Sequence, residues 1–448
     1  MSQVNSSQAS QASRKGRRVF VVGVGMTRFR KPLKKFTKND PDYPEYVSTA
    51  VARALDDCDL SFADIEAASV GSVFSTGMGQ RALYEMGMDG IPIFNVANAC
   101  ATGSNALFMM RNFVAGGMNE CVLAVGVDIM KPGPLGAADA TKGPKGPRKA
   151  SPMDGQLAAM TSKFPIAAAP INPQMFGNAG REHNALYGST PDHFAAIGAK
   201  NHKHSVNNPY SQFRDQYTNE EIKSSRMIYS PLTKLQCSPT SDGAAAAVLC
   251  SEDFVKEHGL EGNAVEIIGQ AMKTDMATAW EKDRPDSCIK SVGYDMAKSA
   301  AADVYAQANI TPDDVQVVEL HDCFSCNELL TYEAIGLAKE GQGHKLVESG
   351  DNTFGGKYVI NPSGGLISKG HPLGATGVAQ CAELNWQLRG ECGPRQVKGA
   401  RVGLQHNLGL GGNVVVTAYR KPAEWGGKQP RRRAPSRAMG VPGMQSRL

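Results

Sequence analysis

The segment Ser363-Gly-Gly-Leu-Ile-Ser-Lys-Gly-His-Pro-Leu-Gly-Ala-Thr-Gly377 contains the most informative turn of the chain, and a helical pattern over 376–388 follows it. So much glycine lets the backbone approach a ligand closely. The proline after His371 and the helix behind it fix the direction of the ring, which suits a base for a thiol or a donor to a ligand oxygen. The alternative is a histidine with a structural role only.

A comparable turn, Asn98-Ala-Cys-Ala-Thr-Gly-Ser104, ends an apolar run and opens a helix that we expect over 104–113. The partial positive charge and free N–H groups of a helix N-terminus lower the pKa of a thiol and favour the thiolate that attacks carbonyls. Cys100 is therefore a candidate nucleophile, and an inert buried cysteine is the alternative. Two such turns suggest a duplicated fold, although the identity between the halves is too weak to establish a repeat.

Outward from the two turns, short β-branched runs alternate with helical patterns, which indicates an α/β architecture. The run over 121–127 shows little polar alternation, as expected of a buried central strand. Between about 130 and 235 the alternation stops and helical pieces appear without strong strands, so we expect an inserted loop domain there. Strands are predicted at 19–24, 68–74, 121–127, 244–250, 265–268, 315–320, near 358, 402–404 and 413–419, and helices near 47–55, 104–113, 296–308 and 376–388.

Two further motifs follow predicted strands. His321-Asp-Cys-Phe324 comes directly after the strand at 315–320, and reactive groups collect at the carboxyl ends of strands in α/β folds. With Cys326 it forms a Cys-x-x-Cys, but a clear fourth ligand and a second cysteine pair at zinc spacing are missing, so no metal is expected. Gln405-His-Asn-Leu-Gly-Leu-Gly-Gly412 is a glycine-rich junction that we expect to line the same cavity.

Composition excludes several classes of protein. With 448 residues and 41% hydrophobic residues the chain can bury a large core, yet no apolar run approaches the roughly 18 residues that span a bilayer, so no integral membrane association is expected. The 48 basic and 43 acidic residues give +5, gathered at 14–18 and 431–433, which we interpret as solvated tails without the motifs of nucleic-acid binding. Gly23-Val-Gly25 lacks the third glycine of an NAD site, and ten scattered cysteines indicate a reducing compartment.

The motifs Cys100, His321-Asp-Cys-Phe324, Gly370-His-Pro372 and His406-Asn-Leu-Gly-Leu-Gly-Gly412, in this order, resemble the thiolase superfamily and, more narrowly, the sterol carrier protein thiolases. The resemblance covers about 18–421 and implies two similar βαβαβαββ halves in a five-layered α-β-α-β-α core, usually as a homodimer. The expected units are 18–130 with 235–258 for the N-terminal half, 131–234 for the inserted loop domain, and 259–421 for the C-terminal half.

The resemblance also implies residue roles. Cys100 matches the nucleophile that takes the acyl group, and His371 matches the residue that activates it. Ordinary thiolases have Asn-Glu-Ala-Phe in place of His321-Asp-Cys-Phe324, and Cys-x-Gly in place of Asn407-Leu-Gly409, so the usual acid/base cysteine is missing. In the sterol carrier protein type the cysteine of this motif takes over, so the resemblance implies that Cys323 is the acid/base and that His321 helps to bind the oxyanion. Substrate binding is expected from His406, Asn407, Gly409 and Ser368.

The activity implied by the resemblance is CoA-dependent thiolytic cleavage of a 3-oxoacyl-CoA, with branched or sterol-derived chains and the reverse Claisen condensation as extensions. CoA would be a substrate, and no permanently bound cofactor is expected. Two alternatives stay open: a non-catalytic acyl-CoA or lipid-binding protein of the same fold, and a condensing enzyme that works in the synthetic direction or on another acyl carrier.

Both ends of the chain differ from the body in composition. Residues 1–17 have too few apolar residues to pack, so we predict a flexible extension, with a mitochondrial transit peptide as the alternative. Residues 422–448 are expected to be a flexible basic tail without room for a fused sterol-carrier domain. The tail ends in Ser446-Arg-Leu448, which resembles the address read by the peroxisomal import receptor. A peroxisome or a related organelle such as the glycosome is therefore expected, with the mitochondrion as the alternative.

Overall fold

The computed structural model describes residues 16–35, 37, 40–74, 79–133, 154–276, 287–410 and 412–433. Ten of the described strands join in one continuous sheet, and a separate hairpin pairs β5 (Met227–Tyr229) with β6 (Leu232–Thr233). The first half of the large sheet contains β1 (Val19–Met26), β2 (Ala67–Gly71), β3 (Ile93–Val96), β4 (Cys121–Asp128) and β7 (Gly243–Ser251). The second half contains β8 (Val265–Lys273), β9 (Val317–Glu319), β10 (Val359–Ile360), β11 (Val402–Gly409) and β12 (Asn413–Arg420).

The order of the strands reveals the duplication that the two glycine turns suggest. The first half reads β3-β2-β4-β7-β1 and the second reads β10-β9-β11-β12-β8, which is the same order relative to the chain. The directions also match, because β2 and β9, each second from an edge of the sheet, pair in parallel with two neighbours, and the last two pairings of each half are antiparallel. A short antiparallel contact of Phe20 with Glu266 joins β1 to β8.

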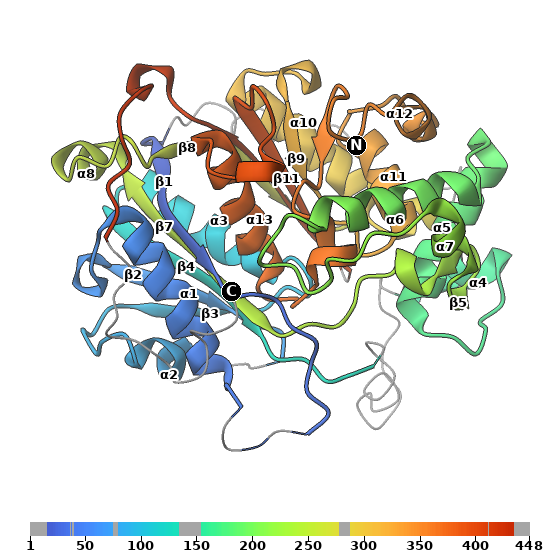
Figure 1. The fold of residues 1–448 in the computed structure, drawn as a ribbon, viewed down its shortest axis with the longest axis horizontal. Helices are drawn as coiled ribbons and strands as arrows, with labels where there is room; N and C mark the ends of the chain where they lie inside the picture. Colours follow the sequence, from blue (N-terminus) through green and yellow to red (C-terminus); the bar gives the residue numbers. More distant parts are fainter. Residues whose placement is uncertain are drawn as a thin grey trace, which may run out of the picture.

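The layers follow from the hydrophobic clusters. Helices α3 (Thr102–Ala115) and α13 (Thr376–Arg389) share one core with side chains from both half-sheets and lie between them (Figure 1). Helix α1 (Tyr43–Cys58) covers the outer face of the first half, and α10 (Tyr294–Ala308) and α11 (Ser325–Ala334) cover that of the second. This arrangement confirms the five-layered α-β-α-β-α fold.

Glycine lets the two central helices meet at their N-termini. A Cβ added at Gly103 would lie 2.5 Å from the carbonyl oxygen of Gly374, and one added at Gly377 would lie 2.3 Å from the backbone nitrogen of Ser104. Any side chain there would push the helices apart. The turns that precede α3 and α13, which carry Cys100 and His371, are therefore held next to each other.

The segment between β4 and β7 forms a helical layer beside the second half. It contains α4 (Asp154–Lys163), α5 (Ile171–Tyr187), α6 (Pro191–Ser205) and α7 (Asn219–Ser224), drawn in green in Figure 1. Helix α6 is tied to the second half by buried polar groups, since the Lys200 Nζ donates to the carbonyl of Ile360 at 3.0 Å and the Asn201 amide donates to Asp322 at 2.8 Å. The inserted layer thus closes over the strand ends of the C-terminal half.

Most of the predicted strands and helices are present. Some of them begin or end at other residues than predicted, because hydrogen bonds to distant segments set their limits. The strand predicted at 68–74 ends at Gly71, because the amides of Val73 and Phe74 donate to the carboxylate of Asp128 instead of a neighbouring strand. The strand predicted at 265–268 continues to Lys273, because it pairs with β12 along most of its length. In the described part of the chain, no helix is long and apolar enough to cross a membrane.

The described arginines at the two ends are mostly exposed, as the solvated-tail interpretation expects, but they also form ion pairs with the body of the protein. Arg18 forms ion pairs with three glutamates from separate segments, and Arg431 and Arg433 both pair with Asp59 at 3.0 and 3.2 Å. Residues 422–433 therefore run along the first half as a defined segment. Residues 1–15 and 434–448, on which the predictions of a flexible extension and a targeting signal fall, lie outside the described residues.

Candidate active site

Three of the predicted catalytic side chains meet where the two halves join. The Cys100 sulfur and one ring nitrogen each of His321 and His371 all lie within 4.8 Å of one another. Cys100 comes from the turn before α3, His321 follows β9, and His371 comes from the turn before α13. The histidine rings pack edge to face with their centroids 5.2 Å apart. Cys323, two residues after His321, lines the same cavity.

The backbone around Cys100 is sharply folded. Ala99 has a φ of 46°, a left-handed conformation that alanine rarely adopts, and the backbone amide of Asn98 donates to the Thr102 hydroxyl at 2.7 Å. Strand β11 passes close to this turn, because a Cβ at Gly409 would lie 2.6 Å from the carbonyl of Asn98. Gly409 is therefore needed for packing against the turn that carries Cys100, and it is not among the residues that line the main cavity.

The pKa of Cys100 runs against the expectation from its position before a helix. Burial, together with the nearby Asp128 carboxylate, raises the pKa to about 12, while the backbone N–H groups of Leu410 and of Cys100 itself lower it. The pKa of Cys323 is also raised well above its usual value, by burial first and then by Cys100. Both thiols are thus neutral in the free protein, and Cys100 needs a base to react.

The hydrogen bonds of His371 leave its ring able to act as a base. Its Nδ1 lies 2.8 Å from the hydroxyl of Thr376, and this hydroxyl donates its one proton to the carbonyl of Pro372 at 2.9 Å. The hydroxyl must therefore accept from Nδ1–H, which leaves Nε2 unprotonated. Nε2 has no hydrogen-bond partner among the described residues, and burial lowers the pKa of His371 to about 3. A neutral ring with a free acceptor nitrogen is what proton removal from a thiol requires.

The cavity has a volume of about 780 Å³, within the usual range for small-molecule sites. Its walls combine the reactive groups with apolar side chains from the inserted layer, including Phe176, Met227 and Ile228. The exposed charged residues of the lining are Lys31, Arg226, Lys234 and one acid, Asp215, so a net positive charge lies at the opening. The cavity thus suits an apolar chain with an anionic end.

The residues predicted to bind substrate do not line this cavity. Asn407 bonds to the ring of His321, with its Nδ2 3.3 Å from Nδ1, and Ser368 is fully buried with its hydroxyl 2.7 Å from that of Ser205. None of Asn407, Ser368, Gly409 and His406 is among the residues that line the cavity, and direct substrate contact stays a prediction for them. Their contacts support the residues around the site.

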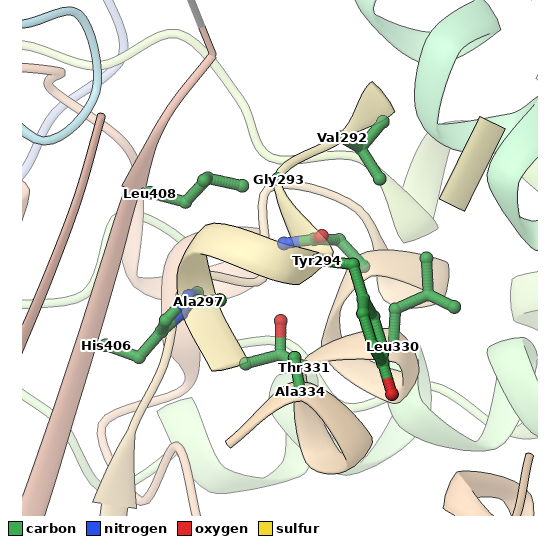
Figure 2. Close-up of a pocket in the computed structure, with 10 residues that line it drawn as sticks. Val292, Gly293, Tyr294, Ala297, Leu330, Thr331, Ala334, His406 and Leu408 are labelled. Atoms are coloured by element: carbon green, nitrogen blue, oxygen red, sulfur yellow. The ribbon is translucent and has the colours of Figure 1, made fainter. Parts of the chain in front are cut away.

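His406 faces a second, much smaller cavity. Figure 2 shows its ring extending towards Ala297 and Thr331, which line that space together with Tyr294. The cavity holds about 10 Å³, roughly the room that one water molecule needs. The pKa of His406 is lowered to about 3 by burial, so the ring is neutral, and its Nε2 has no protein partner among the described residues. His406 therefore belongs to the wall behind His321.

Two buried aspartates hold the turn of His371 from both sides: Asp128, which the sequence did not indicate, and Asp322, which belongs to the predicted motif after β9. Asp128 accepts from the amide of Gly374 at 2.6 Å and from the Ser72 hydroxyl at 2.7 Å. Asp322 accepts from the amides of Leu366 and Ile367 at 2.6 and 3.2 Å. The only sequence signal for these roles is that each aspartate lies at or just after the carboxyl end of a strand.

The pH dependence of alkylation tests the protonation states of this pair. Because the pKa of Cys100 is about 12, the thiolate fraction should rise about tenfold per pH unit between pH 6 and 9, and the rate of inactivation by iodoacetamide should rise with it. Free glutathione, whose rate levels off near its own pKa, is the control. A plateau in the protein below pH 8 would instead indicate a preformed thiolate and imidazolium.

A duplicated α/β fold that holds a strained cysteine turn beside a neutral histidine is an arrangement suited to an enzyme that transfers acyl groups. The sequence matches the thiolase N-terminal domain over 19–253 and the family described as thiolase C-terminal domain-like over 282–418. The chain belongs to the thiolase family. It is an acyltransferase of the 3-oxoacyl-CoA thiolase type.

Individual relatives place the chain more narrowly. It is 57% identical to sterol carrier protein 2 of Oryctolagus cuniculus over 90% of this chain and 72% of that protein. It is 35% identical to an acetyl-CoA acetyltransferase of Methanothermobacter thermautotrophicus over 90% of this chain and 99% of that protein. Human mitochondrial 3-ketoacyl-CoA thiolase in complex with CoA has a similar fold, with a TM-score of 0.64 and 18% identity over 90% of this chain and 98% of that one.

Proposed function

We propose that the protein cleaves bulky or branched 3-oxoacyl-CoA thioesters with CoA as the acceptor, and that Cys100, His371, His321 and Cys323 carry the reaction. The observation that carries this proposal is the meeting of two thiols and two differently bonded histidines on one cavity. One thiol forms the covalent intermediate and the other moves protons, so both halves of a thiolysis reaction have the groups that they need.

In the first half-reaction the Cys100 thiol gives its proton to Nε2 of His371 as the sulfur attacks the 3-oxo carbon. The carbon–carbon bond between C2 and C3 then breaks, and its electron pair passes to C2 of the departing acetyl- or propionyl-CoA enolate. The thiol of Cys323 protonates that carbon. His321 donates to a developing negative oxygen, which is the kind of contact that contributes most to such reactions.

In the second half-reaction CoA cleaves the acyl-enzyme. The Cys323 thiolate takes the proton of the CoA thiol, and the CoA sulfur attacks the acyl carbonyl carbon. The bond to Cys100 breaks, and the departing thiolate recovers its proton from His371. The products are a shortened acyl-CoA and the enzyme in its starting protonation state.

The shape and charge of the cavity support this class of substrate. Apolar walls from the inserted layer leave room for a branched chain, and the exposed Lys31, Arg226 and Lys234 can face the phosphate groups of CoA. Human mitochondrial 3-ketoacyl-CoA thiolase, solved in complex with CoA, shares the fold. CoA is proposed as a substrate, and no permanent cofactor is proposed.

The test follows the loss of a short and of a 2-methyl-branched 3-oxoacyl-CoA when CoA is added. We expect turnover of both, with a kcat/KM for the branched substrate within about tenfold of that for the short one, because a roomy apolar pocket discriminates weakly against an added methyl group. Binding of both substrates without turnover would overturn the proposal and favour a binding protein of the same fold.

Assembly as a homodimer and delivery to a peroxisome or related organelle complete the proposal. Among the described strands β3 pairs only with β2, so it leaves one edge of the large sheet free, and free edges favour pairing with another chain. Light scattering that shows a monomer at micromolar concentration would contradict the dimer. Unchanged localisation after removal of Ser446-Arg-Leu448 would contradict the targeting role of those residues.

A further inference from the structure

A chain of buried hydrogen bonds leads from β12 to the ring of His321. The Tyr419 hydroxyl donates to Gln405 Oε1 at 2.6 Å, and Gln405 Nε2 donates to the Ser104 hydroxyl at 2.9 Å. The Ser104 hydroxyl donates to Asn407 Oδ1 at 2.9 Å, and Asn407 Nδ2 lies 3.3 Å from Nδ1 of His321. Tyr419, Gln405, Ser104 and Asn407 are all fully buried.

The direction of this chain is fixed at Gln405. Its Nε2 lies 2.6 Å from the backbone carbonyl of Gly377, which can only accept, while its Oε1 faces the Tyr419 hydroxyl. The amide of Gln405 therefore has one orientation. Its nitrogen must point towards Ser104.

The same order of donors and acceptors continues from Gln405 through Ser104 to His321. The Ser104 hydroxyl has one proton, and because it accepts from Gln405 it gives that proton to Asn407 Oδ1. Asn407 then presents its Nδ2 to His321, so Nδ1 of His321 is an acceptor. Burial lowers the pKa of His321 well below its usual value, so the ring is neutral. A neutral imidazole that accepts at Nδ1 carries its proton on Nε2.

We propose that Ser104 and Gln405 are positioning residues that set the tautomer of His321, so that its Nε2–H is available as a donor to the substrate oxygen. His371 has the opposite tautomer, because Thr376 accepts from its Nδ1–H. The site thereby has one histidine that donates and one that accepts. Ser104 lies on α3 of the first half and acts on a histidine of the second half. The catalytic role of this tautomer rests on the proposed function. The assignment of the tautomer follows from the hydrogen bonds and does not depend on that function.

The first test combines Ser104→Ala with NMR of protein labelled with ¹⁵N at its nine histidines, where His321→Gln identifies the His321 signals. Wild-type His321 should show Nε2 protonated and Nδ1 bare. In Ser104→Ala the Asn407 amide loses its fixed orientation, so we expect a mixture of tautomers. The kcat should fall about tenfold or more with little change in KM, since loss of an oxyanion donor acts on the transition state.

Ser69→Ala is the matched control. Ser69 is another fully buried serine of the first half, and its hydroxyl has no partner among the described residues. This variant should keep both the His321 signals and the kcat of the wild type. A Ser104→Ala protein whose His321 signals stay unchanged would overturn the proposal, as would a wild-type His321 protonated at Nδ1.

Asn407→Asp gives a second readout that a merely structural role would not produce. A carboxylate facing Nδ1 can only accept, so it favours the tautomer with the proton on Nδ1, and the neutral His321 ring then has no proton on Nε2 and no donor function there. At low pH the ring becomes imidazolium and regains Nε2–H, so activity should rise as pH falls and disappear as pH rises, in contrast to the wild type. A uniform loss at every pH would count against the proposal. If the wild type turns over no 3-oxoacyl-CoA, the proposed function fails, but the NMR signals still test the tautomer.

Discussion

Replacing Cys100 with alanine should abolish thiolysis, with kcat reduced by about 10⁴-fold or more, because the covalent acyl-enzyme can no longer form. The residual cavity and His321 would still bind and polarise substrate, so the Kd for a 3-oxoacyl-CoA should change little. Mass spectrometry of the wild type mixed with substrate in the absence of CoA should find the acyl group on the peptide that contains Cys100. The alanine variant should show no acyl adduct.

Cys326→Ala provides the matched control for this loss. The Cys326 thiol is fully buried, donates to the carbonyl of Phe176 at 3.1 Å and does not line the main cavity. It should keep near wild-type turnover and the same acyl adduct on Cys100. An acyl adduct on another cysteine, or full turnover without Cys100, would show that the nucleophile has been assigned to the wrong residue.

The positions of the reactive groups could be predicted because each follows a local pattern. Cys100 and His371 precede helices in glycine-bearing turns, and His321 and Cys323 follow an apolar strand. In a duplicated α/β fold, turns at equivalent places in the two halves come together at the junction, as the contact of Gly103 with Gly374 shows. Local sequence therefore indicated which residues meet.

The protonation states could not be predicted in the same way. A cysteine before a helix suggests a lowered pKa, yet burial raises the pKa of Cys100 to about 12. Removing a thiolate from water destabilises it more than the backbone N–H groups of the turn stabilise it. The contacts that set the tautomer of His321 join Ser104 to Gln405 and Asn407 across about 300 positions of the chain. Such long-range pairings leave no local pattern.

The fold, too, could be predicted from local sequence only in part. Alternating runs predicted most strands and central helices, and the resemblance supplied the duplicated topology. The short strands β9 and β10 are set by pairing with β11 and with each other, so their limits depend on partners distant in the sequence. The arginines at 431–433 looked like a solvated tail by composition, but Asp59 and Glu391, which bind them, lie in other segments.

Replacing Cys323 with alanine should lower kcat by about 10²-fold to 10⁴-fold, because the enolate then has no acid beside it and the CoA thiol no base. Cys100 and His371 stay in place, so the protein should still bind substrate and should still acquire the acyl group on Cys100, only slowly. The direct measurement is the exchange of the C2 protons of acetyl-CoA with D₂O, which requires the acid/base group and no carbon–carbon bond formation.

That exchange separates the two thiols. The exchange should be fast in the wild type and lost in Cys323→Ala. It should stay fast in Cys326→Ala, which changes the other cysteine of the same Cys-x-x-Cys. Cys323 is placed for this role by the backbone, since its carbonyl accepts from the amide of Ser238 at 2.9 Å and its side chain lines the cavity next to Cys100. Exchange that survives in Cys323→Ala would move the acid/base role to another group on the cavity wall. His321 would then be the nearest candidate, and its Nε2–H would have to act as an acid as well as an oxyanion donor.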